Sequence, residues 1–290
     1  MRLATRGSPL ARAQAEQVAA ALGGADVVPV RSTDGEPGDK SRYVRGVEQA
    51  LLDAEADLGV HSAKDLPGEL PDGLELVGVP GREDSADAFV GSAGSLDELS
   101  AGARVGTSSL RRRAQLLALR PDIEVVALRG NVDSRLRKLA EGQYDAIVLA
   151  VAGLVRLGRS AEIAFRFSPQ ELTPAPGQGS LALEARADDA EAAAAAGRIS
   201  DRAALVELTA ERAAVGSLGA SCETPVGVCA RFEASELVVD GFAGLPDGSE
   251  WVRDRVAGDH DQPAALGEAL AERMTAAGAG EILERAAAAA

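Results

Sequence analysis

Basic and hydroxyl side chains gather at one point of this 290-residue chain, between residues 106 and 113. Gly106 ends a short strand pattern, a hydroxyl run from Thr107 to Ser109 follows, and Arg111, Arg112 and Arg113 open a helical pattern. The free N–H groups of a helix N-terminus favour anions, so cations in that turn cost about 0.3–1 kcal/mol each unless a ligand supplies negative charge. The pattern therefore predicts an anion site, in which guanidinium groups suit carboxylates or phosphates. A solvated helix face is the alternative.

A second corner of the same kind occupies residues 128–135, LRGNVDSR. A strand pattern delivers Arg129, Gly130 permits a tight turn, Asn131 begins a helix and Arg135 lies inside it. Two such strand-to-helix turns would together present a continuous set of hydrogen-bond donors. Surface charges beside a glycine turn explain this motif equally well.

A base and an acid stand side by side in HSAKDLP, residues 61–67. In a cleft, Lys64 would hold a carboxylate, while Asp65 would remain ionised and stabilise a cation developing on a substrate. The alternative is a loop ion pair worth about 0–1 kcal/mol. His61, at the end of a strand pattern, is expected to be packed and hydrogen-bonded rather than catalytic.

The two cysteines have different surroundings. Cys222 lies in a turn-rich loop of small residues, LGASCETPVG, where an accessible thiol would serve as a nucleophile or attachment point. Cys229 lies in the apolar run VGVCA and is expected to be a buried small residue. The spacing of Cys and His resembles neither a zinc site nor a disulfide framework, so no metal is predicted.

Composition limits the classes of function. Forty-five acidic against thirty basic residues give a net charge of −15, and with 3% aromatic residues this opposes nucleic-acid binding. Apolar residues at 46% and charged residues at 26% are typical of a folded globular protein. No apolar stretch approaches the ~18–20 residues of a membrane helix, and the N-terminus lacks a signal-peptide core, which predicts a cytoplasmic protein.

The elements that must position these residues follow an α/β pattern. Strand patterns alternate with helical patterns in the first two-thirds of the chain, which predicts a mainly parallel sheet. The strands are expected at residues 2–5, 26–31, 58–61, 104–106, 124–128 and 146–150. Ser8 as N-cap, Pro9 in the first turn and Gly23 and Gly24 as the stop predict the first helix. Functional residues are expected beyond the carboxyl ends of the strands.

The last third predicts a smaller α+β unit. It has a helical pattern at 201–215 and strand patterns at 226–232, 237–242 and 251–256. Proline and glycine interrupt the chain near residues 81–85 and 173–179, which are candidate hinges.

Seven segments, in order from Arg2 almost to the C-terminus, resemble the porphobilinogen deaminase (hydroxymethylbilane synthase) family. They are LATRGSPLA at 3–11, HSAKDLP at 61–67, GTSSLRR at 106–112, LRGNVDSR at 128–135, DAIVLAVAGLVRLG at 145–158, PAPGQGSLALE at 174–184 and LGASCETPVG at 218–227. The resemblance implies an α/β protein of three domains. Domain 1 would span 1–81 plus 177–198, domain 2 82–176 and domain 3 199–290. The first two would resemble the lobes of type II periplasmic binding proteins, with the active cleft between them, and the small α+β third domain would carry the cofactor cysteine.

The resemblance also implies a transferase of tetrapyrrole (heme-type) biosynthesis. Such an enzyme deaminates four porphobilinogen molecules and joins them head to tail on a dipyrromethane primer, then releases hydroxymethylbilane; ammonia is the other product. The primer would be held by a thioether to Cys222, and Asp65 would be the catalytic residue. Cofactor carboxylates would be bound by Lys64, Thr107, Ser109, Arg111 and Arg112, and the substrate by Arg6, Ser8, Arg129 and Arg135. The expected partner is a small-molecule substrate, without nucleic acid or membrane, and the expected state is a monomer.

One segment departs from the family pattern. Where the family has a lid rich in glycine and lysine, this chain has GDKSRYVRGV at 38–47, in which Lys40 and Tyr43 would take the roles of a lysine and a phenylalanine. A rival interpretation is a non-catalytic, two-lobed receptor for a small dicarboxylate. It would use the same arginines but leave Cys222 and the third domain without a role.

Overall fold

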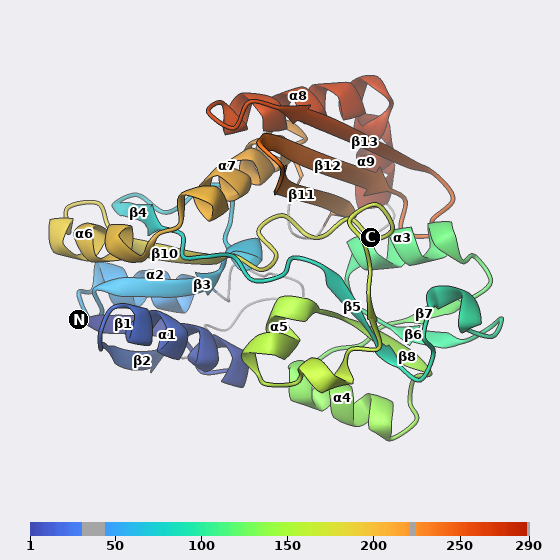
Figure 1. Ribbon diagram of the computed structural model, residues 1–290, viewed down its shortest axis with the longest axis horizontal. Coiled ribbons are helices and arrows are strands. Elements are labelled where there is room, and N and C mark those ends of the chain that lie inside the picture. The colour runs from blue at the N-terminus through green and yellow to red at the C-terminus, as the bar shows by residue number, and fades with distance from the viewer. Residues whose placement is uncertain (31–43, 221–223, 289–290) are drawn as a thin grey trace.

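The computed structural model describes residues 1–30, 44–220 and 224–288 of the chain. These residues form three sheets with helices packed on them, and the third sheet lies above the first two in Figure 1. Cys222 and the expected lid residues Lys40 and Tyr43 lie outside the described residues.

The first sheet has the strand order β2-β1-β3-β10-β4. Its strands are β1 (Arg2–Arg6), β2 (Asp26–Val30), β3 (Leu58–Ser62), β4 (Leu74–Gly78) and β10 (Leu181–Arg186), and its helices are α1 (Pro9–Ala21), α2 (Arg45–Leu52) and α6 (Ala190–Ile199). Helix α1 begins as predicted, because Ser8 Oγ accepts a hydrogen bond from Ala11 N at 3.3 Å. It ends at Ala21, just before Gly23 and Gly24, whose positive φ angles suit glycine.

The second sheet has the order β7-β6-β8-β5-β9. It contains β5 (Asp87–Gly91), β6 (Arg104–Gly106), β7 (Glu124–Val126), β8 (Ala146–Ala150) and β9 (Phe165–Arg166), with helices α3 (Leu110–Leu119), α4 (Val132–Ala140) and α5 (Val151–Arg156). The expected mainly parallel sheet is wrong for half of the strand pairs. Strands β5 and β10 each follow a segment that arrives from the other sheet, and both pair antiparallel with their neighbours.

The third unit is the predicted α+β layer. Strands β11 (Val226–Glu233), β12 (Glu236–Gly244) and β13 (Trp251–Gly258) form an antiparallel sheet, covered by α7 (Arg202–Ser217), α8 (Pro263–Ala276) and α9 (Ala279–Ala288) (Figure 1). Its core includes Val228, Val239, Leu270 and Met274. The predicted fold class, two α/β lobes and a small α+β unit, is confirmed.

Two segments carry the chain between the first and second sheets, at residues 79–86 and 167–180. They are joined to each other, since Gln178 Nε2 donates to Ser85 O at 2.8 Å and Arg82 Nε donates to Gln178 O at 3.0 Å. The third unit is tied to them by Glu211 of α7, whose carboxylate accepts from Gly177 N at 2.6 Å. The two lobes and the third unit therefore meet around Gly177 and Gln178. Within the described ranges, no helix has both the length and the apolar character to cross a membrane.

Candidate active site

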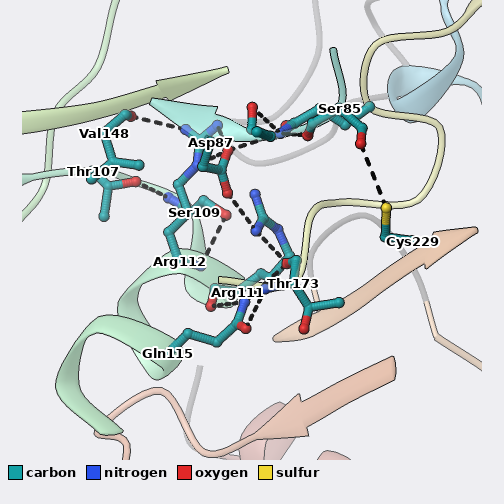
Figure 2. Close-up of polar contacts among 12 residues, drawn as sticks. Ser85, Asp87, Thr107, Ser109, Arg111, Arg112, Gln115, Val148, Thr173 and Cys229 are labelled. Carbon is teal, nitrogen blue, oxygen red and sulfur yellow. Dashed lines mark hydrogen bonds and ion pairs between the residues drawn. The ribbon is translucent and has the colours of Figure 1, made fainter. Parts of the chain in front are cut away.

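A fully buried carboxylate, Asp87 at the start of β5, organises the arginines of α3 (Figure 2). Its Oδ2 accepts a hydrogen bond from Arg111 Nη1 at 2.7 Å, and its Oδ1 accepts from Arg112 Nε at 3.0 Å and Nη2 at 2.7 Å. Burial alone would raise the pKa of the Asp87 carboxyl, but the two guanidinium groups outweigh it and hold that pKa well below its usual range. The protein itself therefore supplies part of the negative charge that the helix entrance was expected to take from a ligand.

The two arginines differ in the donors that remain available. Arg112 Nη1 donates to Val148 O at 3.0 Å, so all three of its nitrogens have protein partners. Arg111 Nη1 also donates to Thr173 O at 2.6 Å, while its buried Nε has no partner among the described residues. A buried N–H without an acceptor is costly. Arg113 instead donates to Pro246 O of the third unit at 3.1 Å.

The predicted hydroxyl residues form the entrance to α3. Ser109 is its N-cap and accepts from Arg112 N at 3.4 Å, and Thr107 Oγ1 accepts from Ser109 N at 3.2 Å (Figure 2). The hydroxyl of Ser108 donates to Leu128 O at 2.9 Å, which ties the entrance to the strand end before Arg129. The sequence prediction of a capped, arginine-bearing helix start is thus confirmed.

Lys64 reaches the same cluster from the first lobe. It lies in the 3₁₀ turn Ala63–Asp65 after β3, and its Nζ donates to Gln178 Oε1 at 3.2 Å. Gln178 Nε2 in turn donates to Asp87 Oδ1 at 2.8 Å. Burial and the neighbouring Arg112 guanidinium lower the pKa of Lys64 to about 8. One ammonium and two guanidinium groups thus surround the single carboxylate of Asp87, which leaves the cluster with excess positive charge.

Asp65 lies on the other side of Lys64, toward β1. Its Oδ2 is 3.9 Å from Arg6 Nη1, and both side chains line a small cavity together with His61 and Ser62. The side chains of Asp65 and Arg6 are 27% and 29% exposed, so both can be reached by a solute. Asp65 therefore sits between the excess positive charge of the Lys64 cluster and a cavity lined by Arg6.

His61 is packed, as predicted. Its Nε2 lies 2.9 Å from Glu184 Oε2, and both side chains are almost completely buried. The pair connects β3 to β10 in the middle of the first sheet.

The remaining predicted substrate residues lie at helix starts. Gly153 of α5 brings two of these starts together, because a Cβ on it would lie 3.6 Å from Leu10 of α1 and 3.9 Å from Val132 of α4. The predicted residues next to these positions are Ser8, Arg129 and Arg135. Arg129 is exposed, Arg135 Nε donates to Gly130 O at 2.7 Å, and Ser8 caps α1.

The described cysteine is buried, as the sequence predicted. Cys229 has no exposed surface, its Sγ lies 3.5 Å from Ser85 Oγ, and burial raises its thiol pKa to about 11 (Figure 2). Such a thiol is a poor nucleophile at neutral pH.

Cys222 is outside the described residues, but the strand that follows it lies against the arginine cluster: Val228 N donates to Pro174 O at 3.0 Å, next to Thr173. In the described part of the chain, no group of three His, Cys, Asp or Glu side chains could hold a metal ion.

Three residues of the cluster were missed by sequence reasoning: Asp87, Gln178 and Thr173. Asp87 is an acidic residue inside the apolar strand pattern ADAFV, which is a usable signal for a buried ion pair. Gln178 lies in the PAPGQGSLALE segment, and only its position in space shows what its amide contacts. Thr173 takes part through its backbone oxygen, for which side-chain patterns give no signal.

Comparison with known proteins accounts for this arrangement. A family model described as porphobilinogen deaminase, dipyromethane cofactor binding domain, matches residues 1–194, and the model of the porphobilinogen deaminase C-terminal domain matches residues 205–276. The chain belongs to the porphobilinogen deaminase family. The resemblance seen in the sequence is confirmed, and the part of the chain that holds Lys64, Asp87 and the two arginines is the family's dipyrromethane-binding domain.

Individual members of the porphobilinogen deaminase family are similar over most of the chain. The enzyme of Roseiflexus sp. (strain RS-1) is 50% identical over 238 residues, which cover 82% of this chain and 78% of that protein. The enzyme of Desulforudis audaxviator (strain MP104C) is 49% identical over 249 residues, covering 86% and 81%. Among solved structures, a TRAP periplasmic solute binding protein from Desulfovibrio salexigens is 12% identical, with a TM-score of 0.42, and covers 69% of this chain and 72% of that one.

Proposed function

We propose that this chain condenses four porphobilinogen molecules head to tail on a dipyrromethane primer, with loss of ammonia at each addition, and that water then cleaves the bond to the primer and releases hydroxymethylbilane. It is thus a transferase of tetrapyrrole biosynthesis. The observation that carries the proposal is the excess of positive charge around Asp87, formed by the partly buried Lys64 and the buried Arg111 and Arg112, directly beside the Asp65 carboxylate. A neutral or cationic substrate would not compensate that charge, whereas a polycarboxylate does.

The residues at the cluster fit a dipyrromethane. Each of its two pyrroles carries an acetate and a propionate, so the group brings four carboxylates to a site that has surplus donors. The Lys64 ammonium is one such donor, since the acceptor found for it among the described residues is the single oxygen of Gln178. The residues that would hold the carboxylates are Lys64, Thr107, Ser109, Arg111 and Arg112. When bound, the cofactor supplies the pyrrole carbon to which the first substrate unit is added.

We assign the covalent attachment, a thioether, to Cys222. Cys222 is four residue steps before Val226, the first residue of β11, and four extended residues span at most about 14 Å. Val228 N donates to Pro174 O beside Thr173 of the cluster, so the strand that follows Cys222 is anchored next to the arginine site, which supports the assignment. Cys229 is unsuited to the role because its thiol is buried and its pKa is raised to about 11.

We assign the catalytic role to Asp65. Its carboxylate stabilises the positive charge that develops on the porphobilinogen pyrrole as ammonia leaves, since a fixed negative charge in a partly buried site is worth more than in water. Arg6 Nη1 lies 3.9 Å from Asp65 Oδ2 at the cavity and is placed to bind a substrate carboxylate. Ser8, Arg129 and Arg135 would bind the remaining substrate carboxylates from the helix starts on either side of α5.

We further propose that the three domains have the boundaries expected from the sequence, with domain 1 at 1–81 plus 177–198, domain 2 at 82–176 and domain 3 at 199–290. The division of the strands among three sheets supports these limits. The protein is proposed to be a cytoplasmic monomer whose partner is a small-molecule substrate. Its net charge of −15 opposes binding to nucleic acid or an anionic membrane.

The test is turnover by an Asp65→Asn variant. Asparagine keeps the size of the side chain but removes its charge, so kcat for ammonia release from porphobilinogen should fall by about 10²–10⁴ while the attached cofactor is retained. Asp57→Asn, which removes a carboxylate that pairs with Arg2 on the surface of the same lobe, is the control and should turn over normally. Normal turnover by Asp65→Asn would refute the catalytic assignment. A wild-type protein that binds porphobilinogen without releasing ammonia would refute the enzyme and favour a two-lobed receptor.

A further inference from the structure

The side chain of Gln178 joins the two lobes inside the charged cluster. It is 1% exposed, and its Nε2 donates to Ser85 O and to Asp87 Oδ1, both at 2.8 Å. At the other end of the amide, Oε1 accepts from Lys64 Nζ at 3.2 Å. Lys64 follows a strand of the first sheet and Asp87 begins a strand of the second, so this one amide connects the cations of both lobes.

The polarity of the amide is matched to its neighbours. Three oxygen atoms, of Ser85, Ala86 and Asp87, face Nε2, and an ammonium faces Oε1. Glutamine donates at one end and accepts at the other, whereas a carboxylate only accepts. A glutamate of the same length would therefore meet the oxygen atoms with a further acceptor.

The charge of the residue at position 178 matters as much as its hydrogen bonds. The ionised groups that face Lys64 are the carboxylates of Asp65 and Asp87 and the guanidinium groups of Arg111 and Arg112. Asp87 already accepts hydrogen bonds from both arginines. The hydrogen-bond acceptor found for Lys64 within the described chain is the neutral oxygen of Gln178. Lys64 is therefore held in place while its positive charge stays unmatched.

We propose that Gln178 is a positioning residue, which fixes the Lys64 ammonium at the junction of the lobes without neutralising it, so that Lys64 is reserved for a ligand carboxylate. The proposal rests on the assignment of Lys64 as a carboxylate-binding residue. It adds that the neutrality of residue 178 sets the strength of this anion site.

The test compares two isosteric substitutions, Gln178→Glu and Gln115→Glu. Gln115 is a matched control, since it is also fully buried and bonds the same cluster through Thr173, with its Nε2 3.0 Å from Thr173 O, but it does not contact Lys64. The readout is the pKa of Lys64, measured in the full chain with Cys222→Ser, from the pH dependence of lysine acylation located by peptide mass. An opposite charge at hydrogen-bond distance should raise that pKa by about 1–3 units in Gln178→Glu. The pKa of Lys64 should be unchanged in Gln115→Glu.

No rise in Gln178→Glu, or an equal rise in both variants, would overturn the proposal. If Gln178→Glu fails to fold, a measurement on the otherwise unaltered chain takes its place. The ¹⁵N shift of the Gln178 side-chain amide should titrate with a midpoint near the Lys64 pKa of about 8 and should lose that titration in Lys64→Met. A flat shift, or one that is the same in Lys64→Met, would also overturn it.

A second readout, with Cys222 intact, links the positioning role to the ligand. The fraction of purified chains that carry two additional pyrroles, read from the intact mass, should be lower in Gln178→Glu than in Gln115→Glu. Equal fractions of pyrrole-carrying chains in the two variants would contradict the proposal that Lys64 is kept available for a ligand carboxylate. Wild-type chains without any mass increase would instead refute the proposed function, and the titration of Lys64 would still decide the role of Gln178.

Discussion

Replacing Asp87 with asparagine tests whether the arginine cluster is organised by the protein itself. The substitution keeps the shape of the side chain but leaves Arg111 and Arg112, both more than 90% buried, without their shared counterion. Removing one partner of a buried ion pair costs about 3–5 kcal/mol, because the remaining charge stays desolvated. For a chain of this size that corresponds to a fall of about 6–20 °C in the unfolding midpoint.

The assay is differential scanning calorimetry of the cofactor-free chain, with Asp122→Asn as the control. Asp122 also pairs with an arginine of the same region, Arg120 at 2.7 Å, but its side chain is 44% exposed. Water and salt screen such a pair, so its loss should leave the midpoint almost unchanged. Equal, small shifts in the two variants would refute the buried ion-pair cluster.

The pH dependence gives the same prediction an independent check. The folded-state pKa of Asp87 lies well below its unfolded value near 3.9, so the contribution of Asp87 to stability is complete above about pH 4. It is lost progressively as the pH falls from about 4 toward the depressed folded-state value. The difference between wild type and Asp87→Asn should therefore be constant from pH 7 down to about pH 5 and shrink in strong acid, whereas a difference that disappears near pH 6 would contradict the assignment.

Two further outcomes follow from the same contacts. The folded-state pKa of Lys64, about 8, lies below its ordinary value of 10.5, so the stability of the cofactor-free wild type should rise between these pH values, where only the unfolded chain keeps the proton. Lys64→Met should therefore be more stable than wild type at pH 7 and lose that advantage by about pH 10.5 in thermal scans; an advantage that grows with pH would contradict this. A Cβ on Gly227 would lie 2.6 Å from Thr173 O, the acceptor of Arg111, so Gly227→Ala should cost about 1–3 kcal/mol in denaturant unfolding. Gly216→Ala, which meets nothing within 4 Å, should be neutral or stabilising, and equal losses in the two would refute the close contact.

Local rules account for the parts of the fold that the sequence predicted. Ser8, Ser109 and Asn131 each accept a hydrogen bond from the backbone of the following turn, and an N-cap depends only on residues within that turn. The strands before these helices were predicted for the same reason, because short apolar runs and the turns after them are local patterns. Hence the helix starts that carry the anion-binding residues could be read directly from the sequence.

Long-range pairing explains what the sequence did not predict. Strand β10 pairs with β3, more than 100 residues earlier, and its antiparallel direction follows from the crossing of the chain between lobes. Asp87 meets Arg111 across 24 residues, and Gln178 meets Lys64 across 114. Cations at the start of α3 need negative charge nearby, as the helix dipole predicts. That Asp87 provides part of this charge depends on how two distant segments pack, which no local sequence pattern shows.

The proposed covalent attachment of the cofactor to Cys222 is tested most directly by the intact mass of the chain purified from cells. We predict a wild-type mass greater than the sequence mass by two linked pyrroles, the same increase in Cys229→Ser, and the bare sequence mass in Cys222→Ser. An increase that persists in Cys222→Ser, or a wild-type chain that stays at its bare mass after incubation with porphobilinogen, would contradict it.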